Sequence, residues 1–186
     1  MGPSEADTGA RKIIARMVLP LVFLIFLSSL DRVNVSFAQL RMGEALDLSP
    51  SAYGLGVSLF FIGYLLFQAP SLWLLDRVGA RLWIAATVFC WGLIATAMTF
   101  VETKTHFYIL RVLLGFAEAG FAPGIALTCS RWLPRRHLTA TISKTTLAIP
   151  ISVIVGGPLS TWLMSISNPL GMDGWRWMFL AEGLPT

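Results

Sequence analysis

The stretch from Tyr108 to Leu127 contains two ionisable residues, Arg111 and Glu118, in an otherwise apolar sequence. The stretch is long enough for a helix to cross a bilayer core of about 30 Å. An ionisable residue near the centre of such a helix costs about 2.5–3.5 kcal/mol on insertion scales. Their spacing places Arg111 and Glu118 about 20° apart around a helix and ~10 Å apart along it. We therefore expect both side chains to share one face that looks into a polar cavity, not into lipid.

The composition indicates an all-α integral membrane protein. Of the 186 residues, 55% are hydrophobic and 13% are charged, whereas about 25% are charged in soluble domains. The apolar residues form long runs and not the short alternating segments of a membrane barrel. A chain that only needed an anchor would not carry charges at the centre of a span, so these features are typical of a transporter.

The same composition excludes several other classes of function. The net charge is +4, but the basic residues are scattered among loops, so we expect no nucleic-acid partner. Cys90 and Cys129 lie in apolar runs without the spacing of metal ligands, so we expect no metal, cofactor or disulfide. The sequence also contains no nucleophile–base cluster, so an enzyme is not expected.

Five complete spans and the start of a sixth are predicted. The first five run from about Ile13 or Met17 to Phe37, and then over about 53–74, 82–100, 107–127 and 139–164; the sixth begins at Trp175. Residues 1–12 are interpreted as a cytoplasmic tail. Residues 13–186 are interpreted as a six-helix domain that is incomplete, because the chain stops before its sixth helix can cross.

Local signals refine these spans. Ser49 and Pro50 are typical of an N-cap and first turn for the second span. Pro123 removes a backbone donor and should bend the fourth span just beyond Glu118. Pro150 and the segment 156–158, Gly-Gly-Pro, predict a bent fifth span. Most of the tryptophans, with Trp91 counted among them, are expected near span ends, where indole favours the membrane interface.

The basic residues predict the orientation in the membrane. One side has only Arg41, Lys104 and Arg176 in its loops. The other side collects most of the basic residues: Arg11, Lys12, Arg16, Arg77, Arg81, Arg131, Arg135, Arg136 and Lys144. By the positive-inside rule, the N-terminus and the loops after the second and fourth spans are cytoplasmic.

The segment Asp31-Arg32-Val33-Asn34 allows two interpretations. If the first helix ends at Leu30, Asp31 and Arg32 lie in solvent. If the helix continues, Asn34 lies on the Asp31 face, and two serines flank Arg32 at four-residue steps, Ser28 and Ser36. The apolar pattern continues beyond the segment without Gly or Pro, so we predict that Asp31 and Arg32 lie at membrane depth.

Two further motifs have both a functional and a structural interpretation. The segment 76–81 is a tight turn in which Gly79 permits the reversal, while Asp76, Arg77 and Arg81 either bridge helix ends or lie in a solvated loop. On the second span, Tyr64 and Gln68 lie one turn apart and either face the cavity or pack against a neighbouring helix.

At these residues the chain resembles the N-terminal half of a major facilitator superfamily transporter, and within that superfamily the anion:cation symporter family. The resemblance covers nearly the whole chain, and its most specific element is the motif that runs from Arg111 through Gly115, Glu118, Ala119, Gly120, Pro123 and Gly124. The other elements are the segments 31–38, 61–64, 76–81, 156–160 and 174–177.

The resemblance implies a secondary active carrier of small organic anions, usually carboxylates, that is coupled to proton entry and sits in the bacterial inner membrane. It implies that Arg32 and Arg111 bind the substrate anion. It also implies that Asp31 and Glu118 couple protons. Asn34 and Tyr64 are further candidates for substrate binding. Segment 76–81 would help to set the conformational equilibrium. A carrier of this kind has two six-helix halves, so the C-terminal half would be an additional partner. The alternative is a non-transporting membrane subunit or a non-functional truncated fragment.

Overall fold

A computed structural model describes residues 5–132, 135–166 and 171–184, and among these it leaves the side chains of 5–18, 40, 132 and 135–137 undescribed. Every long element in the described part is an α-helix. In chain order these are α1 (Glu5–Ala45), α2 (Pro50–Val78), α3 (Ala80–Ala97), α4 (Lys104–Glu118), α5 (Phe121–Trp132), α6 (Arg135–Thr146), α7 (Ala148–Ser165) and α8 (Gly174–Gly183), with a short 3₁₀ turn at Met98–Phe100.

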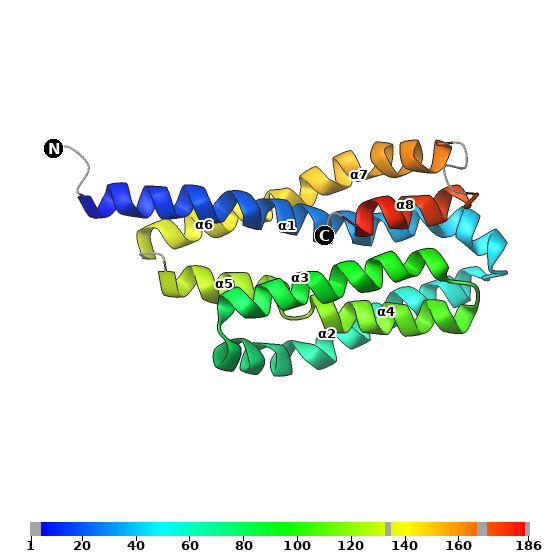
Figure 1. Ribbon diagram of the computed structural model, residues 1–186, viewed down its shortest axis with the longest axis horizontal. Helices are drawn as coiled ribbons and strands as arrows, with labels where there is room; N and C mark the ends of the chain where they lie inside the picture. Colours follow the sequence, from blue (N-terminus) through cyan, green and yellow to red (C-terminus); the bar gives the residue numbers. More distant parts are fainter. Residues whose placement is uncertain (1–4, 133–134, 167–170, 185–186) are drawn as a thin grey trace.

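The helices lie side by side along the long axis of the molecule (Figure 1). The most extensive helix pairs are α2 with α4 and α1 with α7, while α3 contacts both α4 and α8. Figure 1 also shows α5 continuing along the long axis from the end of α4, and α7 continuing from the end of α6. Each of these two pairs therefore acts as one broken span.

The five predicted spans are confirmed. Five segments are long and apolar enough to cross a membrane: Leu19–Gln39, Pro50–Val78, Ala80–Phe100, Lys104–Arg131 and Leu138–Ser165. The predicted sixth span corresponds to α8, whose first residue, Gly174, lies one position before the expected start. The first helix begins at Glu5, inside the segment interpreted as a tail, so helical structure extends beyond the expected start of the first span.

Proline explains why the fourth and fifth spans are interrupted. The backbone turns between α4 and α5 at Ala119 and Gly120, and α6 is separated from α7 at Leu147. Pro123 and Pro150 cannot donate to the carbonyl groups four residues earlier, and their rings clash with those carbonyls. The interruptions lie next to Pro123 and Pro150, where bends were predicted, whereas α7 continues as a helix through the segment 156–158.

The two helix-end signals between the first three spans are also confirmed. The Ser49 hydroxyl accepts a hydrogen bond of 3.2 Å from the Ala52 amide, and Pro50 occupies the first turn of α2. Gly79 has a φ of 88°, a left-handed conformation that a residue with a Cβ rarely adopts. This glycine allows α3 to reverse direction directly after α2.

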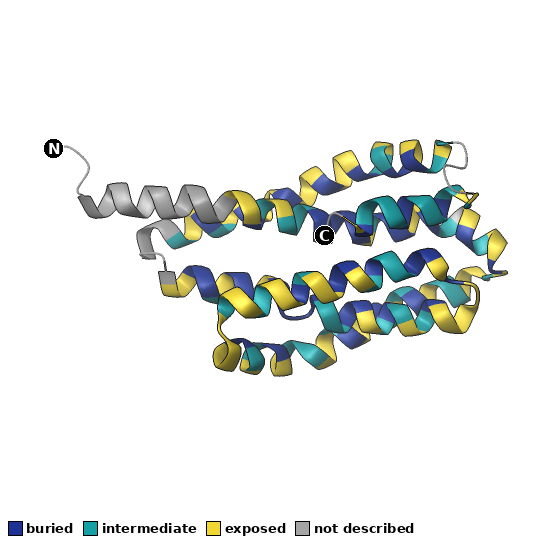
Figure 2. Cartoon of the chain, in the orientation of Figure 1, coloured by how far each residue is buried: buried dark blue, intermediate teal, exposed yellow. Residues whose placement is uncertain are grey.

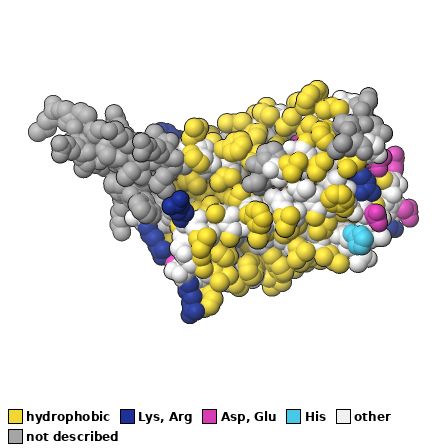
Figure 3. All heavy atoms as spheres, in the orientation of Figure 1, with side chains coloured by type: hydrophobic (Ala, Val, Ile, Leu, Met, Phe, Trp, Pro, Cys, Tyr) yellow, Lys and Arg dark blue, Asp and Glu magenta, His cyan; other side chains and the backbone are white. Residues whose placement is uncertain are grey.

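The outside of the bundle is apolar over its middle and charged at its ends. Large hydrophobic side chains such as Phe89 and Ile154 are more than 70% exposed, and they lie on outward faces of α3 and α7 (Figure 2). Figure 3 shows the hydrophobic side chains in a broad band between two charged ends, one with mainly Lys and Arg and the other with Asp, Glu and His beside further Lys and Arg. A surface of this kind is stable against lipid, so the chain is an integral membrane protein.

Glycine allows α2 and α4 to approach closely. A Cβ at Gly115 would overlap the carbonyl oxygen of Phe60 and lie 2.8 Å from the Tyr64 amide nitrogen, and both of these are backbone atoms of α2. Neither atom can move without shifting the helix. The glycine therefore fixes the distance between α2 and α4, the helix that carries Arg111 and Glu118.

We expect Gly115→Ala to destabilise the chain by about 1–3 kcal/mol, because overpacking against backbone forces the helices apart. Gly54→Ala is the matched control, since a Cβ at that position of α2 meets no atom within 4 Å. Thermal unfolding of the purified chain in detergent measures both effects. Equal melting temperatures for the two variants would show that the α2–α4 contact does not need this glycine.

Candidate functional site

Among the residues whose side chains are described, three that are acidic or basic are buried within the bundle at membrane depth. Asp31 comes from α1, whereas Arg111 and Glu118 come from α4, and their residues are 8%, 3% and 1% exposed. The helix α1 continues to Ala45, so the prediction that Asp31 and Arg32 lie within a membrane span is confirmed. The expectation that Arg111 and Glu118 both turn away from the lipid is also confirmed.

Glu118 is bound to α1 by two side chains that lie one helical turn apart. Its Oε2 accepts hydrogen bonds from Arg32 Nη2 at 2.7 Å, Arg32 Nε at 3.0 Å and Ser28 Oγ at 3.1 Å. The other carboxylate oxygen, Oε1, is buried without a hydrogen-bond partner among the described residues. Three hydrogen bonds therefore hold Oε2, whereas Oε1 is left as an acceptor.

Asp31 faces a different neighbour although it precedes Arg32 directly. Its Oδ2 accepts a hydrogen bond of 2.8 Å from the indole nitrogen of Trp91 on α3. Successive residues of a helix point about 100° apart, so Asp31 and Arg32 cannot serve the same partner. The structure thus separates the two carboxylates that the sequence nominated for proton coupling: one lies against α3 and the other in the contact between α1 and α4.

Arg111 has few polar contacts for a buried guanidinium group. Its Nε lies 3.4 Å from the carbonyl oxygen of Gly56, and its Nη1 is buried without a hydrogen-bond partner among the described residues. The guanidinium carbon lies 4.6 Å from the centre of the Phe60 ring. Arg32 approaches the same ring at 5.5 Å, so Phe60 stands beside both arginines. Two cations with spare donors near one aromatic ring form an arrangement suited to an anion.

The remaining predicted binding residues are placed differently. Asn34 is completely buried against α7, where its Oδ1 accepts a hydrogen bond of 2.7 Å from Ser160, and its Nδ2 has no hydrogen-bond partner in the described part of the chain. Tyr64 is half-buried, and its ring centre lies 5.6 Å from the Arg32 guanidinium carbon. The structure thus brings Tyr64 to the arginines, whereas Asn34 contacts a different helix.

Sequence reasoning did not identify Phe60 and Trp91. Phe60 lies one helical turn before Tyr64 on α2, and this spacing alone could have placed both on the face that meets the arginines. Trp91 lies in the middle of α3 and is 0% exposed, so it is not one of the tryptophans near span ends. Its place at the centre of the third predicted span, 82–100, is consistent with this, but nothing in the sequence indicates its hydrogen-bond partner.

The turn between α2 and α3 is a second polar feature. It lies at an end of the bundle that carries several arginine residues. Arg131 Nη2 lies 2.6 Å from Asp76 Oδ1, so the carboxylate bridges α2 to the end of α5, as expected for a bridge between helix ends. Arg77 stacks over the ring of Trp73 at 3.9 Å. Both members of the ion pair are more than half exposed, and pairs of this kind contribute about 0–1 kcal/mol.

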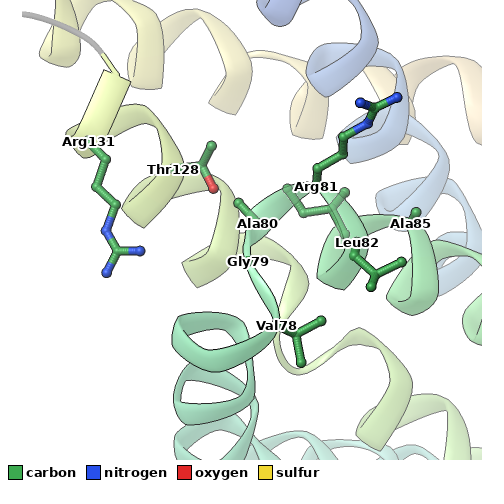
Figure 4. Close-up of a pocket in the computed structure, with 9 residues that line it drawn as sticks. Val78, Gly79, Ala80, Arg81, Leu82, Ala85, Thr128 and Arg131 are labelled. Carbon is green, nitrogen blue, oxygen red and sulfur yellow. The ribbon is translucent and has the colours of Figure 1, made fainter.

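A cavity of about 700 Å³ opens beside this turn and is lined by residues of the segment 78–85 together with Thr128 and Arg131. Figure 4 shows the side chains of Arg81 and Arg131 pointing in different directions, so their charges do not converge on one point. None of its lining residues belongs to the buried cluster around Glu118. The chemistry of the candidate site therefore lies in the buried cluster and not in this cavity.

A bundle of apolar helices around a buried cluster of arginines and carboxylates defines a membrane transporter. Residues 21–186 match the family model for the Major Facilitator Superfamily. The chain belongs to the major facilitator superfamily, as its motifs predicted.

Similar proteins agree with this assignment. The chain is 46% identical over 176 residues to a protein named "Putative tartrate transporter" of Agrobacterium vitis, covering 95% of this chain and 39% of that protein. It is 44% identical over 188 residues to "Putative metabolite transport protein NicT" of Pseudomonas putida, covering 98% and 43%. The chain thus spans about two fifths of the length of these relatives, consistent with the N-terminal half of a transporter.

A solved structure shares the fold. It is a bacterial homologue of the human lysosomal transporter Spinster in an inward-facing and occupied conformation. It matches 92% of this chain and 41% of its own length with a TM-score of 0.82, at 18% sequence identity. At that identity the match shows the architecture alone. Together with the transporter relatives it points to a carrier and not an enzyme.

Proposed function

We propose that this chain forms the N-terminal half of a secondary transporter that carries a small organic anion, a carboxylate, together with protons. The observation that carries the proposal is the buried Glu118 carboxylate, which binds Arg32 and Ser28 across two helices and keeps one oxygen without a partner in the described residues. A structural ion pair needs no spare acceptor at membrane depth. A group that exchanges a proton with its surroundings does.

The two arginines supply the anion site in this proposal. Arg111 has a buried Nη1 without a partner in the described chain, and the Arg32 side chain is 40% exposed, so both have donors to offer. A guanidinium group presents paired N–H donors that match the two oxygens of a carboxylate. Tyr64 lies beside Arg32 in the same region. Asn34 of α1, which contacts α7, has an amide donor and is the further candidate.

The carboxylates supply the proton coupling. When Glu118 takes up a proton it loses its charge, and its hold on Arg32 weakens because the ion pair becomes a neutral hydrogen bond. Arg32 is then available to a substrate anion. Proton uptake and anion binding favour each other through one side chain, which is the linkage that a symporter requires. Asp31 is the second candidate for a proton site.

The turn 76–81 is proposed to bias the conformational equilibrium through the exposed pair of Asp76 and Arg131, with Arg77, Gly79 and Arg81 around it. At this end of the bundle Figure 3 shows Lys and Arg side chains with few acidic ones, and this supports a cytoplasmic location for the turn, and hence a cytoplasmic N-terminus. For a bacterial carrier, the membrane is the inner membrane.

Uptake into liposomes tests the proposal. A carrier that contains this chain as its N-terminal half is reconstituted, and labelled tartrate is supplied outside under an inward proton gradient. We expect accumulation above the external concentration, which collapses when a proton ionophore is added. Accumulation that survives the ionophore would refute proton coupling. Absence of uptake across a panel of mono- and dicarboxylates would refute the anion assignment.

A further inference from the structure

Trp91 makes the closest polar contact to one of the two buried acids. Its side chain is 0% exposed in the middle of α3, and its indole nitrogen donates to Asp31 Oδ2 at 2.8 Å. Both ends of this bond are inside the bundle. The bond joins the middle of α3, where no predicted site residue lies, to the helix that carries Arg32.

The chemistry of indole makes this bond selective for one state of the acid. The indole N–H donates and cannot accept, and it carries no charge at any ordinary pH. An ionised carboxylate accepts such a bond strongly, whereas a protonated acid offers a weaker acceptor. The bond therefore stabilises ionised Asp31 in a place where burial alone opposes the charge.

The position of the donor is fixed by packing. Trp91 belongs to a buried cluster with Leu27 of α1, Phe60 of α2 and Leu114 of α4, and its ring centre lies 6.1 Å from that of Phe121. Three of these neighbours, on α2, α4 and α5, do not belong to α1, so we expect the ring to stay with them if α1 moves. The hydrogen bond is thus made or broken according to the position of α1 against α3.

Other charges also act on Asp31, and a test must separate them from the indole. The groups that interact with it electrostatically come from α1, α4 and α8: Arg32, Arg111, Glu118 and Glu182. All four are untouched by a substitution of Trp91. A change in the titration of Asp31 that follows such a substitution therefore reports on the indole donor.

We propose that Trp91 is a positioning residue that holds Asp31 ionised against α3, so that the acid accepts a proton only when α1 shifts and the hydrogen bond opens. The effect of Trp91 on the titration of Asp31 does not depend on what the carrier transports. The consequence of this effect for transport rests on the proposed function. The protonation of the two acids then depends on different events. Glu118 responds to the substrate anion through Arg32, and Asp31 responds to the movement of α1.

Infrared difference spectroscopy on the purified chain in nanodiscs tests the effect of Trp91 on Asp31 without any transport. The carbonyl stretch of a protonated carboxyl is followed as a function of pH, and the band that disappears in Asp31→Asn is assigned to Asp31. In Trp91→Phe we expect this band to appear at a pH about one unit higher, because the charged form has lost a hydrogen bond. Trp91→Gln restores an N–H donor and should lie closer to the parent chain.

Trp175→Phe is the matched control. Trp175 is also buried, at 1% exposed, but its indole nitrogen has no hydrogen-bond partner among the described residues. This variant loses the same atoms and should leave the Asp31 band in place. If the Asp31 band is unchanged in Trp91→Phe, shifts equally in Trp175→Phe, or is absent from all variants, the proposal is overturned. If Trp91→Phe does not fold, Trp91→Gln decides: a parent-like band supports the proposal, and a shift of one unit or more overturns it.

The transport consequence has a separate readout. In a carrier that contains this chain, Trp91→Phe should move the pH dependence of uptake in the same direction by a similar amount while substrate affinity stays unchanged. An infrared shift without a change in the uptake profile would remove Asp31 from the coupling mechanism but leave the anion site standing. An infrared spectrum without the shift refutes the role of Trp91, whatever the carrier transports.

Discussion

Glu118→Gln should abolish proton-driven accumulation in a carrier that contains this chain, while exchange of substrate across the membrane continues. Glutamine has the shape of the protonated acid and keeps an oxygen that accepts from Arg32 and Ser28, but it cannot release a proton. With one proton per anion, a gradient of one pH unit supports about tenfold accumulation, and that factor should fall to about one. Uptake and counterflow in reconstituted vesicles measure the two quantities separately.

The fold should survive this substitution. Glutamine keeps an oxygen that accepts from Arg32 and Ser28, and the Arg32 side chain is 40% exposed, so the substitution leaves no fully buried charge without a partner. Glu102→Gln, at an exposed position between α3 and α4, controls for the loss of a carboxylate as such. If accumulation persists in Glu118→Gln, the glutamate is a permanent structural partner of Arg32 and the coupling site lies elsewhere.

The burial of Arg111 and Glu118 could be predicted because a membrane makes charge placement expensive. A residue that costs several kcal/mol in lipid has to face the inside of the bundle, so a charge within an apolar span already specifies its own environment. The same reasoning, applied to the unbroken apolar pattern after Arg32, correctly continued the first helix. Sequence thus predicts which side chains are buried when the penalty for exposure is large.

The partners of these charges could not be predicted from spacing. Arg111 and Glu118 were expected to share one face of a helix, yet the hydrogen bonds to Glu118 come from Arg32 and Ser28 on α1. Which residues meet across two helices depends on how each helix is rotated and where it crosses its neighbour. Glycines such as Gly115 set these distances, but their effect appears only after the helices are packed.

Helix rotation also explains why the hydrogen-bond partner of Trp91 could not be predicted. Indole is favourable both at the membrane interface and inside a bundle where its N–H finds an acceptor. The acceptor here, Asp31, lies 60 residues earlier in the sequence, and nothing local to α3 indicates it. Long-range pairs of this kind become visible only in three dimensions.

Arg111→Ala should weaken substrate binding at least about thirtyfold, which corresponds to about 2 kcal/mol, the lower end of the cost of removing one member of a buried charge pair. The reason is that Arg111 has a buried Nη1 without a partner in the described chain and only one long contact of 3.4 Å from its Nε. The Nη1 donor is thus not used by the part of the chain that the structure describes. Substrate affinity is measured by isothermal titration or by protection against thermal unfolding.

Two further variants separate charge from geometry at this position. Arg111→Lys keeps the positive charge but replaces the planar fork by a single ammonium group, so an intermediate loss of affinity is expected if the anion is held by paired hydrogen bonds. Arg41→Ala removes an exposed arginine near the end of α1 and should leave affinity unchanged. An affinity in Arg111→Ala equal to that of the parent carrier would mean that Arg111 serves its contact with the Phe60 ring alone, and Arg32 would then have to hold the anion without it.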